Sequence, residues 1–321
     1  MFDLLIRNAQ VLDGTGAPAY LADVAVKDGK IAAVGKLSGE AAETADAAGL
    51  TLAPGFIDVH GHSDFFMPLD PARASKLLQG VTTELCGQCG LGPAPVTEQN
   101  YPVYHKYLSQ QGIPMYPDDR TFTSFSAYLS RMEQTPAGIN LAYFIPHGTV
   151  RLAVMGFSHD APDDRQLAQM RELVEDAMQA GALGLSTGLA YAPGRFAATD
   201  ELAALTEPVG RYGGVYTSHL RDQGDQLEQS VQEAIDIARR GGARVNVSHH
   251  KAVGEQNFGK VRKTTQMLHE AGIPATHDVY PYAASSTMLI STLPMAFAQL
   301  EPQALLQALA DPGELARLAS L

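Results

Sequence analysis

The stretch Ala53–Asp64, APGFIDVHGHSD, decides the fold. It begins as an apolar run typical of a buried β-strand and ends in two histidines, His60 and His62, separated by one glycine. A histidine at a strand end can simply be a hydrogen-bonding residue. Two imidazoles that follow a buried strand together indicate a polar site, because buried polar groups are costly without partners.

Six further strand-like runs follow, and stretches of helical periodicity separate them. The runs are GVTTELCG (80–87), NLAYFIPHG (140–148), GALGLSTG (181–188), GGVYTSHL (213–220), ARVNVSHH (243–250) and IPATHDVYP (273–281). Helices are predicted over 163–180, 225–240 and 258–271, with Asp163 and Asp225 at N-cap or first-turn positions, and over 302–321 with a Pro-Gly break. Strand–helix alternation of this kind predicts a parallel sheet covered by helices. We expect an α/β fold, a TIM-like (β/α)8 barrel over residues 51–321 that lacks its last unit.

The first fifty residues differ from the rest because short apolar runs with turn signals predict β structure there. KDGK (27–30) is a hairpin signal, whereas residues 38–49, SGEAAETADAAG, are predicted to be weakly structured. The segment from Gly87 to Arg120 is rich in Pro, Gly, Tyr and Gln and is predicted to be a long functional loop or lid.

Composition excludes several classes of function. The 321 residues are 45% apolar and 18% charged, with a net charge of 23 − 35 = −12, which argues against binding to nucleic acid. The sequence predicts no membrane span and no signal peptide, so we expect a cytoplasmic protein that acts on a small molecule. The two cysteines, Cys86 and Cys89, exclude a disulfide framework and leave open a redox pair or half of a zinc knuckle.

Reactive side chains gather at the carboxyl ends of the predicted strands. In chain order they are His60 and His62, Cys86 and Cys89, His147, Ser186 and Thr187, His219, then His249, His250 and Lys251, and finally Tyr280 and Tyr282. The carboxyl ends of barrel strands meet on one face, where catalytic sites form. Imidazole and thiolate are the donors that zinc prefers, so the joint pattern predicts one or two metal ions on that face.

Several motifs together resemble the amidohydrolase superfamily and, within it, the D-aminoacylases or N-acyl-D-amino-acid deacylases. They are APGFIDVHGHSD, QGVTTELCGQCG, GALGLSTGLAYAPG, GGVYTSHLRDQGDQLEQSVQEAI, VNVSHHKAVGEQNFGK and YPYAASSTML, and the resemblance runs to about residue 293. It implies that residues 1–50 form part of a small β-sandwich beside the barrel. It implies zinc-dependent hydrolysis of N-acyl-D-amino acids to a D-amino acid and a carboxylate.

The resemblance also assigns roles to individual residues. It implies one tightly bound zinc held by Cys89, His219 and His249, and a second, weaker site that uses His60 and His62. It places Lys251, Tyr191, Tyr280 and Ser286 around the substrate, with Tyr191 and Lys251 as the catalytic and gripping groups, and leaves Cys86 as a structural thiol.

One part of the family's pattern has no counterpart in this sequence. The general base of these enzymes is an Asp that ends the eighth barrel strand, and no Asp stands in that context here, since Asp278 ends the seventh. We therefore expect the chain alone to hydrolyse poorly, and expect a homo-oligomer or a complementing C-terminal fragment as partner. The alternatives are a cyclic-amide amidohydrolase of the hydantoinase or dihydroorotase kind, a non-catalytic zinc-binding protein, and a structural barrel without metal.

Overall fold

The computed structural model describes residues 1–66, 74–110, 113, 122–287, 293, 294, 297, 300 and 302–320. It divides into two compact units, Met1–Phe56 and Ile57–Leu321. Most of the last ten residues of the predicted lid, Gln111–Arg120, lie outside the described residues. Among the helices that the structure describes, none combines the length and the apolar character that crossing a bilayer requires.

The first unit is a five-stranded sheet. Its strands are β1 (Phe2–Val11), β2 (Tyr20–Lys27), β3 (Lys30–Gly35), β4 (Ala41–Asp46) and β5 (Thr51–Leu52), in the order β3-β2-β1-β4 with β5 also on β1. The predicted KDGK hairpin joins β2 to β3, and its two central residues, Asp28 and Gly29, have the positive φ values of 52° and 70° that such a turn requires. The prediction for residues 38–49 was wrong, because β4 pairs in parallel with β1.

The second unit contains the seven predicted strand positions. They are β6 (Phe56–Asp58), β7 (Val81–Cys86), β8 (Asn140–Tyr143) followed by β9 (Ile145–Pro146), β10 (Gly184–Gly188), β11 (Val215–His219), β12 (Arg244–Val247) and β13 (Ala275–His277). The pairs β7–β8, β9–β10, β10–β11, β11–β12 and β12–β13 are all parallel. At the break between β8 and β9, Phe144 N donates to Cys86 O and Leu183 N to Tyr143 O, so the strands follow one another around a barrel-like sheet.

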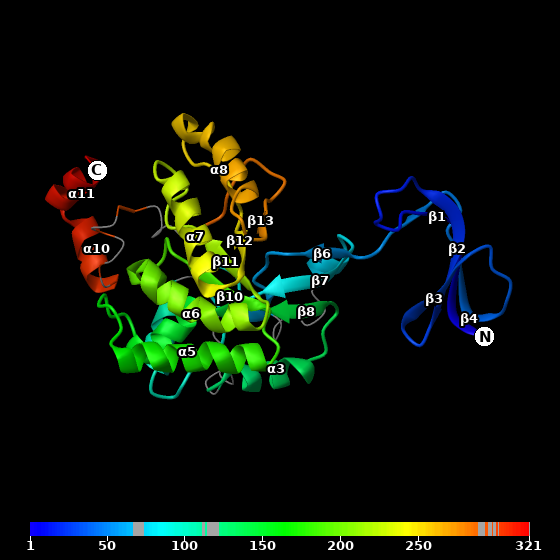
Figure 1. The fold of residues 1–321 in the computed structure, drawn as a ribbon, viewed down its shortest axis with the longest axis horizontal. Coiled ribbons are helices and arrows are strands. Elements are labelled where there is room, and N and C mark those ends of the chain that lie inside the picture. Colours follow the sequence, from blue (N-terminus) through cyan, green and yellow to red (C-terminus); the bar gives the residue numbers. More distant parts are fainter. Residues whose placement is uncertain are drawn as a thin grey trace. The chain divides into compact units, whose positions relative to one another are not determined.

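Helices alternate with these strands, as predicted. They are α1 (Ala74–Leu77), α2 (Tyr101–Gln110), α3 (Phe125–Glu133), α4 (His147–Met155), α5 (Asp164–Gln179), α6 (Thr199–Arg211), α7 (Leu227–Gly241), α8 (Lys260–His269), α10 (Pro302–Ala310) and α11 (Pro312–Ala319). Helices α5 to α8 pack against one another in chain order, outside the strands β10 to β12 (Figure 1). The predicted lid is not wholly a loop, since α2 lies within it.

Two helix starts show how local sequence sets the boundaries. Asp163 caps α5 in a capping box with Gln166, as its position predicts. Asp225 does not cap α7, because Gln226 is the N-cap residue and the Asp225 carboxylate instead accepts a hydrogen bond from Asn257 at 3.0 Å. The prediction for Asp225 was therefore wrong.

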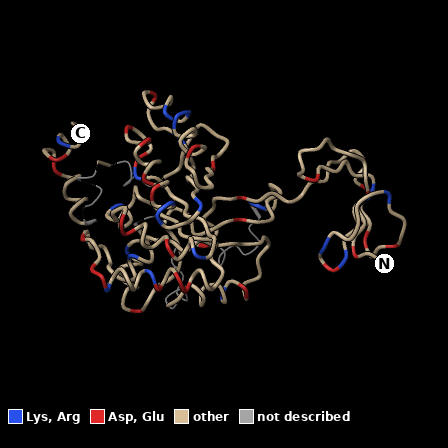
Figure 2. Tube along the Cα trace, in the orientation of Figure 1, with Lys and Arg blue, Asp and Glu red and all other residues tan. Residues whose placement is uncertain are grey.

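The interior of the second unit is mostly apolar, and two of its few buried charges, Arg151 and Glu201, are paired with one another. Met170 and Val174 of α5 are fully buried, each burial stabilising the fold by about 1.5–3 kcal/mol. Along the trace of the outer helices, acidic and basic residues are interspersed and do not separate into stretches of one sign (Figure 2).

Candidate metal centre

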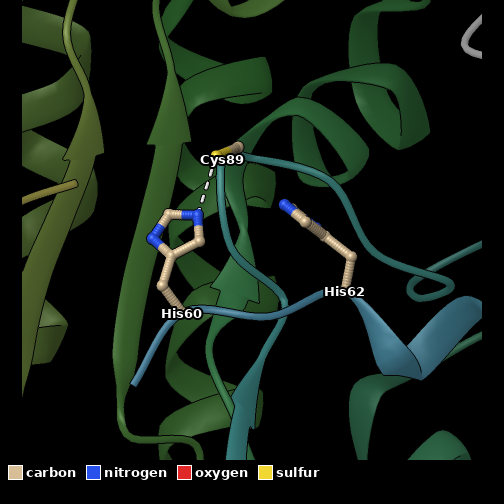
Figure 3. Close-up of side chains that lie close together, drawn as sticks. All are labelled: His60, His62 and Cys89. Atoms are coloured by element: carbon tan, nitrogen blue, oxygen red, sulfur yellow. Dashed lines mark hydrogen bonds between the residues drawn. The ribbon is translucent and has the colours of Figure 1, made fainter. Parts of the chain in front are cut away.

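Five predicted residues meet at the carboxyl ends of the strands. Ligand atoms of His60, His62 and Cys89 lie within 4.8 Å of one another, and so do those of Cys89, His219 and His249. Figure 3 shows the imidazoles of His60 and His62 directed toward Cys89. Cys89 Sγ is 3.3 Å from His60 Nε2 and 3.6 Å from His249 Nε2. One thiol therefore belongs to two potential metal sites.

The backbone of Cys89 adopts a conformation that few side chains tolerate. Its φ of 57° lies in the left-handed region, which costs a non-glycine residue about 1–3 kcal/mol. Ser186 holds the loop in place by donating to Gly87 O and accepting from Gly90 N at 3.1 Å. A Cβ on Gly188 would lie 2.1 Å from Cys89 O, so only glycine fits there. These contacts fix the loop after β7 in the conformation that places the Cys89 thiol among the histidines.

A second glycine sets the spacing of the first two histidines. A Cβ on Gly61 would lie 1.8 Å from Glu84 Oε1. The Glu84 side chain is fully buried and accepts from Ser63 N at 3.2 Å and from Ser63 Oγ at 2.5 Å, so it cannot move aside cheaply. The close approach of the backbone to this carboxylate explains why His60 and His62 flank a glycine.

Replacing Gly61 by alanine is therefore expected to destabilise the protein by about 1–3 kcal/mol, the usual cost of overpacking a rigid interior. Urea unfolding followed by circular dichroism measures the loss. The control is Gly259→Ala, where no heavy atom lies within 4 Å of the new Cβ and φ is −64°. Equal urea midpoints for the two variants would show that the Glu84 side chain moves aside without a measurable cost in stability.

The carboxylate of Asp278 lies next to both His249 and His60. Asp278 Oδ1 accepts from His249 N at 2.6 Å and lies 3.3 Å from His60 Nδ1, while its Oδ2 accepts from Asn246 Nδ2 at 2.8 Å. The Nδ1 atom of His249 lies 3.0 Å from Gln223 Nε2. His249 also has a left-handed φ of 36°. Outer partners of this kind orient imidazole ligands.

The electrostatics of the centre favour a thiolate. Burial alone would raise the pKa of the Cys89 thiol, but the charge of His60 and hydrogen bonds from the surrounding imidazoles outweigh it and hold that pKa well below its usual range. Burial would lower the pKa of His60, but the nearby Cys89 charge raises it to about 10. Burial raises the pKa of the Asp64 carboxyl to about 7. A thiolate among imidazoles is the donor set of a zinc-type site.

The Nδ1 atom of His62 is buried and, among the described residues, makes no hydrogen bond. The donors of the centre are one thiolate and four imidazoles, the types of group that zinc prefers. The donor types and their mutual distances therefore fit a divalent metal.

Two of the predicted substrate-side residues border this centre. Tyr191 OH lies 3.4 Å from His219 Nδ1, and burial raises the pKa of Tyr191 to about 12, so its hydroxyl keeps its proton at neutral pH. Lys251 Nζ lies 3.2 Å from His249 Nδ1. Burial lowers the pKa of Lys251.

The other two lie farther out. The ring of Tyr280 stacks on Tyr282, with centroids 4.8 Å apart, and the Lys251 ammonium stands 5.3 Å from the Tyr280 centroid. Ser286 is exposed and remains a predicted substrate contact.

Three strand-end residues belong to other surroundings. His147 is fully buried, and its Nε2 lies 3.0 Å from Glu201 Oε1. Cys86 is fully buried, and burial raises its pKa, which suits a structural thiol. His250 turns away toward α8, where its Nε2 lies 2.8 Å from a threonine hydroxyl.

The amidohydrolase family matches residues 43–288. The chain belongs to the amidohydrolase family. It is 39% identical to the D-aminoacylase of Alcaligenes xylosoxydans xylosoxydans over 291 residues, which are 90% of this chain and 59% of that protein. It is also 39% identical to the N-acyl-D-aspartate deacylase of the same organism over 293 residues, 89% of this chain and 57% of that protein.

A solved structure gives the same result. The N-acyl-D-glutamate deacylase of Bordetella bronchiseptica, complexed with zinc and a phosphonate inhibitor that mimics the tetrahedral intermediate, aligns with a TM-score of 0.84 and 36% identity. The alignment covers 91% of this chain and 62% of that one. The fold is therefore an amidohydrolase barrel, as predicted, and this chain spans about three-fifths of the length of these relatives.

Sequence reasoning missed the residues that support the centre. From the sequence, Asp278 stands out only as a carboxylate in the wrong place for the general base, and Gln223 and Glu84 do not stand out. The signal for Asp278 is its place directly after β13, next to β12 and its histidine.

Proposed function

We propose that this amidohydrolase chain binds a divalent metal, zinc above all, and contributes to the hydrolysis of N-acyl-D-amino acids. The observation that carries the proposal is the trio of Cys89, His219 and His249, whose ligand atoms lie within 4.8 Å of one another. The similarity to deacylases of D-amino acids supports the substrate class. Cys89 with His60 and His62 would hold a second, weaker ion.

The metal, when bound, supplies Lewis-acid polarisation of the scissile carbonyl. The protonated Tyr191 hydroxyl donates a hydrogen bond to the carbonyl oxygen as negative charge develops there. Lys251 binds the substrate carboxylate, and the Tyr280 ring beside it packs against the substrate. Ser286 adds a hydroxyl group to the same contact. Asp278 holds His60 and the backbone of His249 in place throughout.

We propose that a general base comes from a complementing segment rather than from these residues. Among the described residues, neither trio includes a carboxylate. The outer strands β6 and β13 stand beside exposed apolar side chains, Ile57 at 61%, Val59 at 48% and Val279 at 66% exposure. A further strand would cover such edges. A segment that pairs there and brings a carboxylate would satisfy both needs.

The test compares N-acetyl-D-methionine with its L isomer, with turnover expressed per bound zinc. We expect D-selective amide hydrolysis that is slow for the chain alone and faster after mixing with the unmatched part of a related deacylase, and expect 1,10-phenanthroline to abolish it. Ordinary turnover by the isolated chain would contradict the complementing base.

Two other outcomes address the alternatives. Zinc bound without hydrolysis in either format would favour a non-catalytic zinc-binding protein. Hydrolysis of hydantoins in place of N-acyl amino acids would favour the cyclic-amide enzyme. Enzymes of that kind usually bridge two metal ions with a carboxylated lysine at a strand end. Here the strand Gly184–Gly188, GLSTG, has no lysine and Cys89 is present instead, which argues against this alternative.

A further inference from the structure

The loop between β10 and α6, residues 189–198, carries Tyr191 beside His219. Its ring and that of His219 have centroids 4.6 Å apart. Arg195 N donates to Tyr191 O at 2.7 Å, so residues 191–195 form one closed turn. Contacts that fix the backbone at Arg195 therefore also restrict the movement of Tyr191.

Arg221, two residues after His219, reaches across to this loop. Its Nη1 donates to Arg195 O at 2.8 Å and its Nη2 to Ala197 O at 3.0 Å. The same guanidinium binds Glu233 of α7 in a two-pronged pair, with Nε to Oε2 at 3.0 Å and Nη2 to Oε1 at 2.9 Å. We call this arrangement the Arg221–Glu233 clamp.

Glu233 extends the clamp to the start of α6, since its Oε1 also accepts from Thr199 Oγ1 at 3.0 Å. The clamp therefore joins the loop that carries Tyr191, the loop that follows His219, and helix α7. These segments are adjacent in space but separate in sequence.

We propose that Arg221 is a positioning residue that sets the placement of the Tyr191 hydroxyl against the metal centre. The role of Tyr191 rests on the proposed function. The Arg221 side chain is 32% exposed, and an ion pair so open to water adds little stability. Its contacts nevertheless fix two backbone carbonyls and a carboxylate at once. Only the planar five-donor fork of arginine can do this, because a lysine offers one point charge.

The main variant is Arg221→Lys, which keeps the charge and loses the fork. We expect kcat per bound metal to fall by about 10–100-fold with little change in KM, because a displacement of about 1 Å in a reacting group can cost 100-fold. The matched control is Arg239→Lys on α7, which loses a similar pair of bonds, to Asp236 Oδ1 and Ala271 O, away from the centre. We expect the control to keep parental kinetics.

A second measurement does not depend on hydrolysis. The chain contains no tryptophan, so Phe196→Trp, between the two clamped carbonyls, gives a unique fluorophore where Phe196 now stacks on His159 with centroids 4.0 Å apart. Adding Arg221→Lys is expected to lower its anisotropy and raise its acrylamide quenching constant, whereas adding Arg239→Lys changes neither. The charge-transfer band of bound Co²⁺ is expected to stay unchanged in every variant.

The outcomes separate the two proposals. Changed fluorescence with an intact Co²⁺ band supports the clamp, even if no variant or parent hydrolyses an N-acyl amino acid, in which case the proposed function fails alone. Unchanged fluorescence or loss of the Co²⁺ band in Arg221→Lys would overturn the positioning role. If the parent hydrolyses the substrate, an unchanged kcat in Arg221→Lys would overturn it as well.

Discussion

Replacing Cys89 by serine is expected to remove the tightly bound metal and hydrolysis together. Cys89 is common to both potential sites, so its loss breaks each of them. A serine hydroxyl keeps its proton at neutral pH, whereas the Cys89 thiol has a pKa held well below its usual range by the imidazoles around it. Removing a residue that only hydrogen-bonds to a metal ligand costs roughly 10–100-fold in metal affinity. The loss for Cys89→Ser, which removes a ligand itself, should be larger.

Elemental analysis after desalting, together with the thiolate charge-transfer band of Co²⁺, measures this loss. Cys86→Ala is the matched control, because Cys86 is also buried, lies three residues away and belongs to neither trio. The control should bind metal as the parent does. If Cys89→Ser kept a full equivalent of tightly bound metal, the proposed centre would be wrong.

Asp278→Asn is expected to weaken metal binding by about 10–100-fold while the fold survives. The carboxylate contacts the backbone of His249, His60 Nδ1 and Asn246 at the same time. An amide has only one acceptor oxygen, so at least one of these contacts is lost or opposed by an N–H group. Competitive titration with a chromogenic chelator measures the affinity.

Asp225→Asn is the control for this variant. Asp225 also accepts a side-chain hydrogen bond, from Asn257, but belongs to neither potential metal site. Equal metal affinities for Asp278→Asn and Asp225→Asn would show that Asp278 does not support the ligands.

The gathering of reactive side chains on one face could be predicted from the sequence because it depends on one rule, whereas the choice of the ligands among them rested on the resemblance to the deacylases. Each candidate residue followed an apolar run, and the carboxyl ends of parallel strands converge. Strands β7, β11 and β12 form where the runs predict them, which places Cys89, His219 and His249 on that face. The same rule also selects His147 and His250, whose side chains contact Glu201 and Thr264 instead, so it does not by itself single out the trio.

The rule places Asp278 at a strand end, but its partners could not be predicted in this way, because its contacts depend on register. Asp278 reaches His60 and His249 only because β13 pairs with β12 so that Val247 lies opposite His277. Strand β4 was missed for a related reason. Its sequence, AAETAD, has little intrinsic strand preference, and pairing with β1 determines its structure.

The position of the ligands along the chain has a consequence for folding. Cys89 and His249 are 160 residues apart, and every strand from β7 to β12 lies between or beside them. Closing so long a loop is entropically costly, so the trio of Cys89, His219 and His249 is expected to come together only with the assembled sheet. An ion bound by that trio would then stabilise the folded state by mass action, without nucleating it.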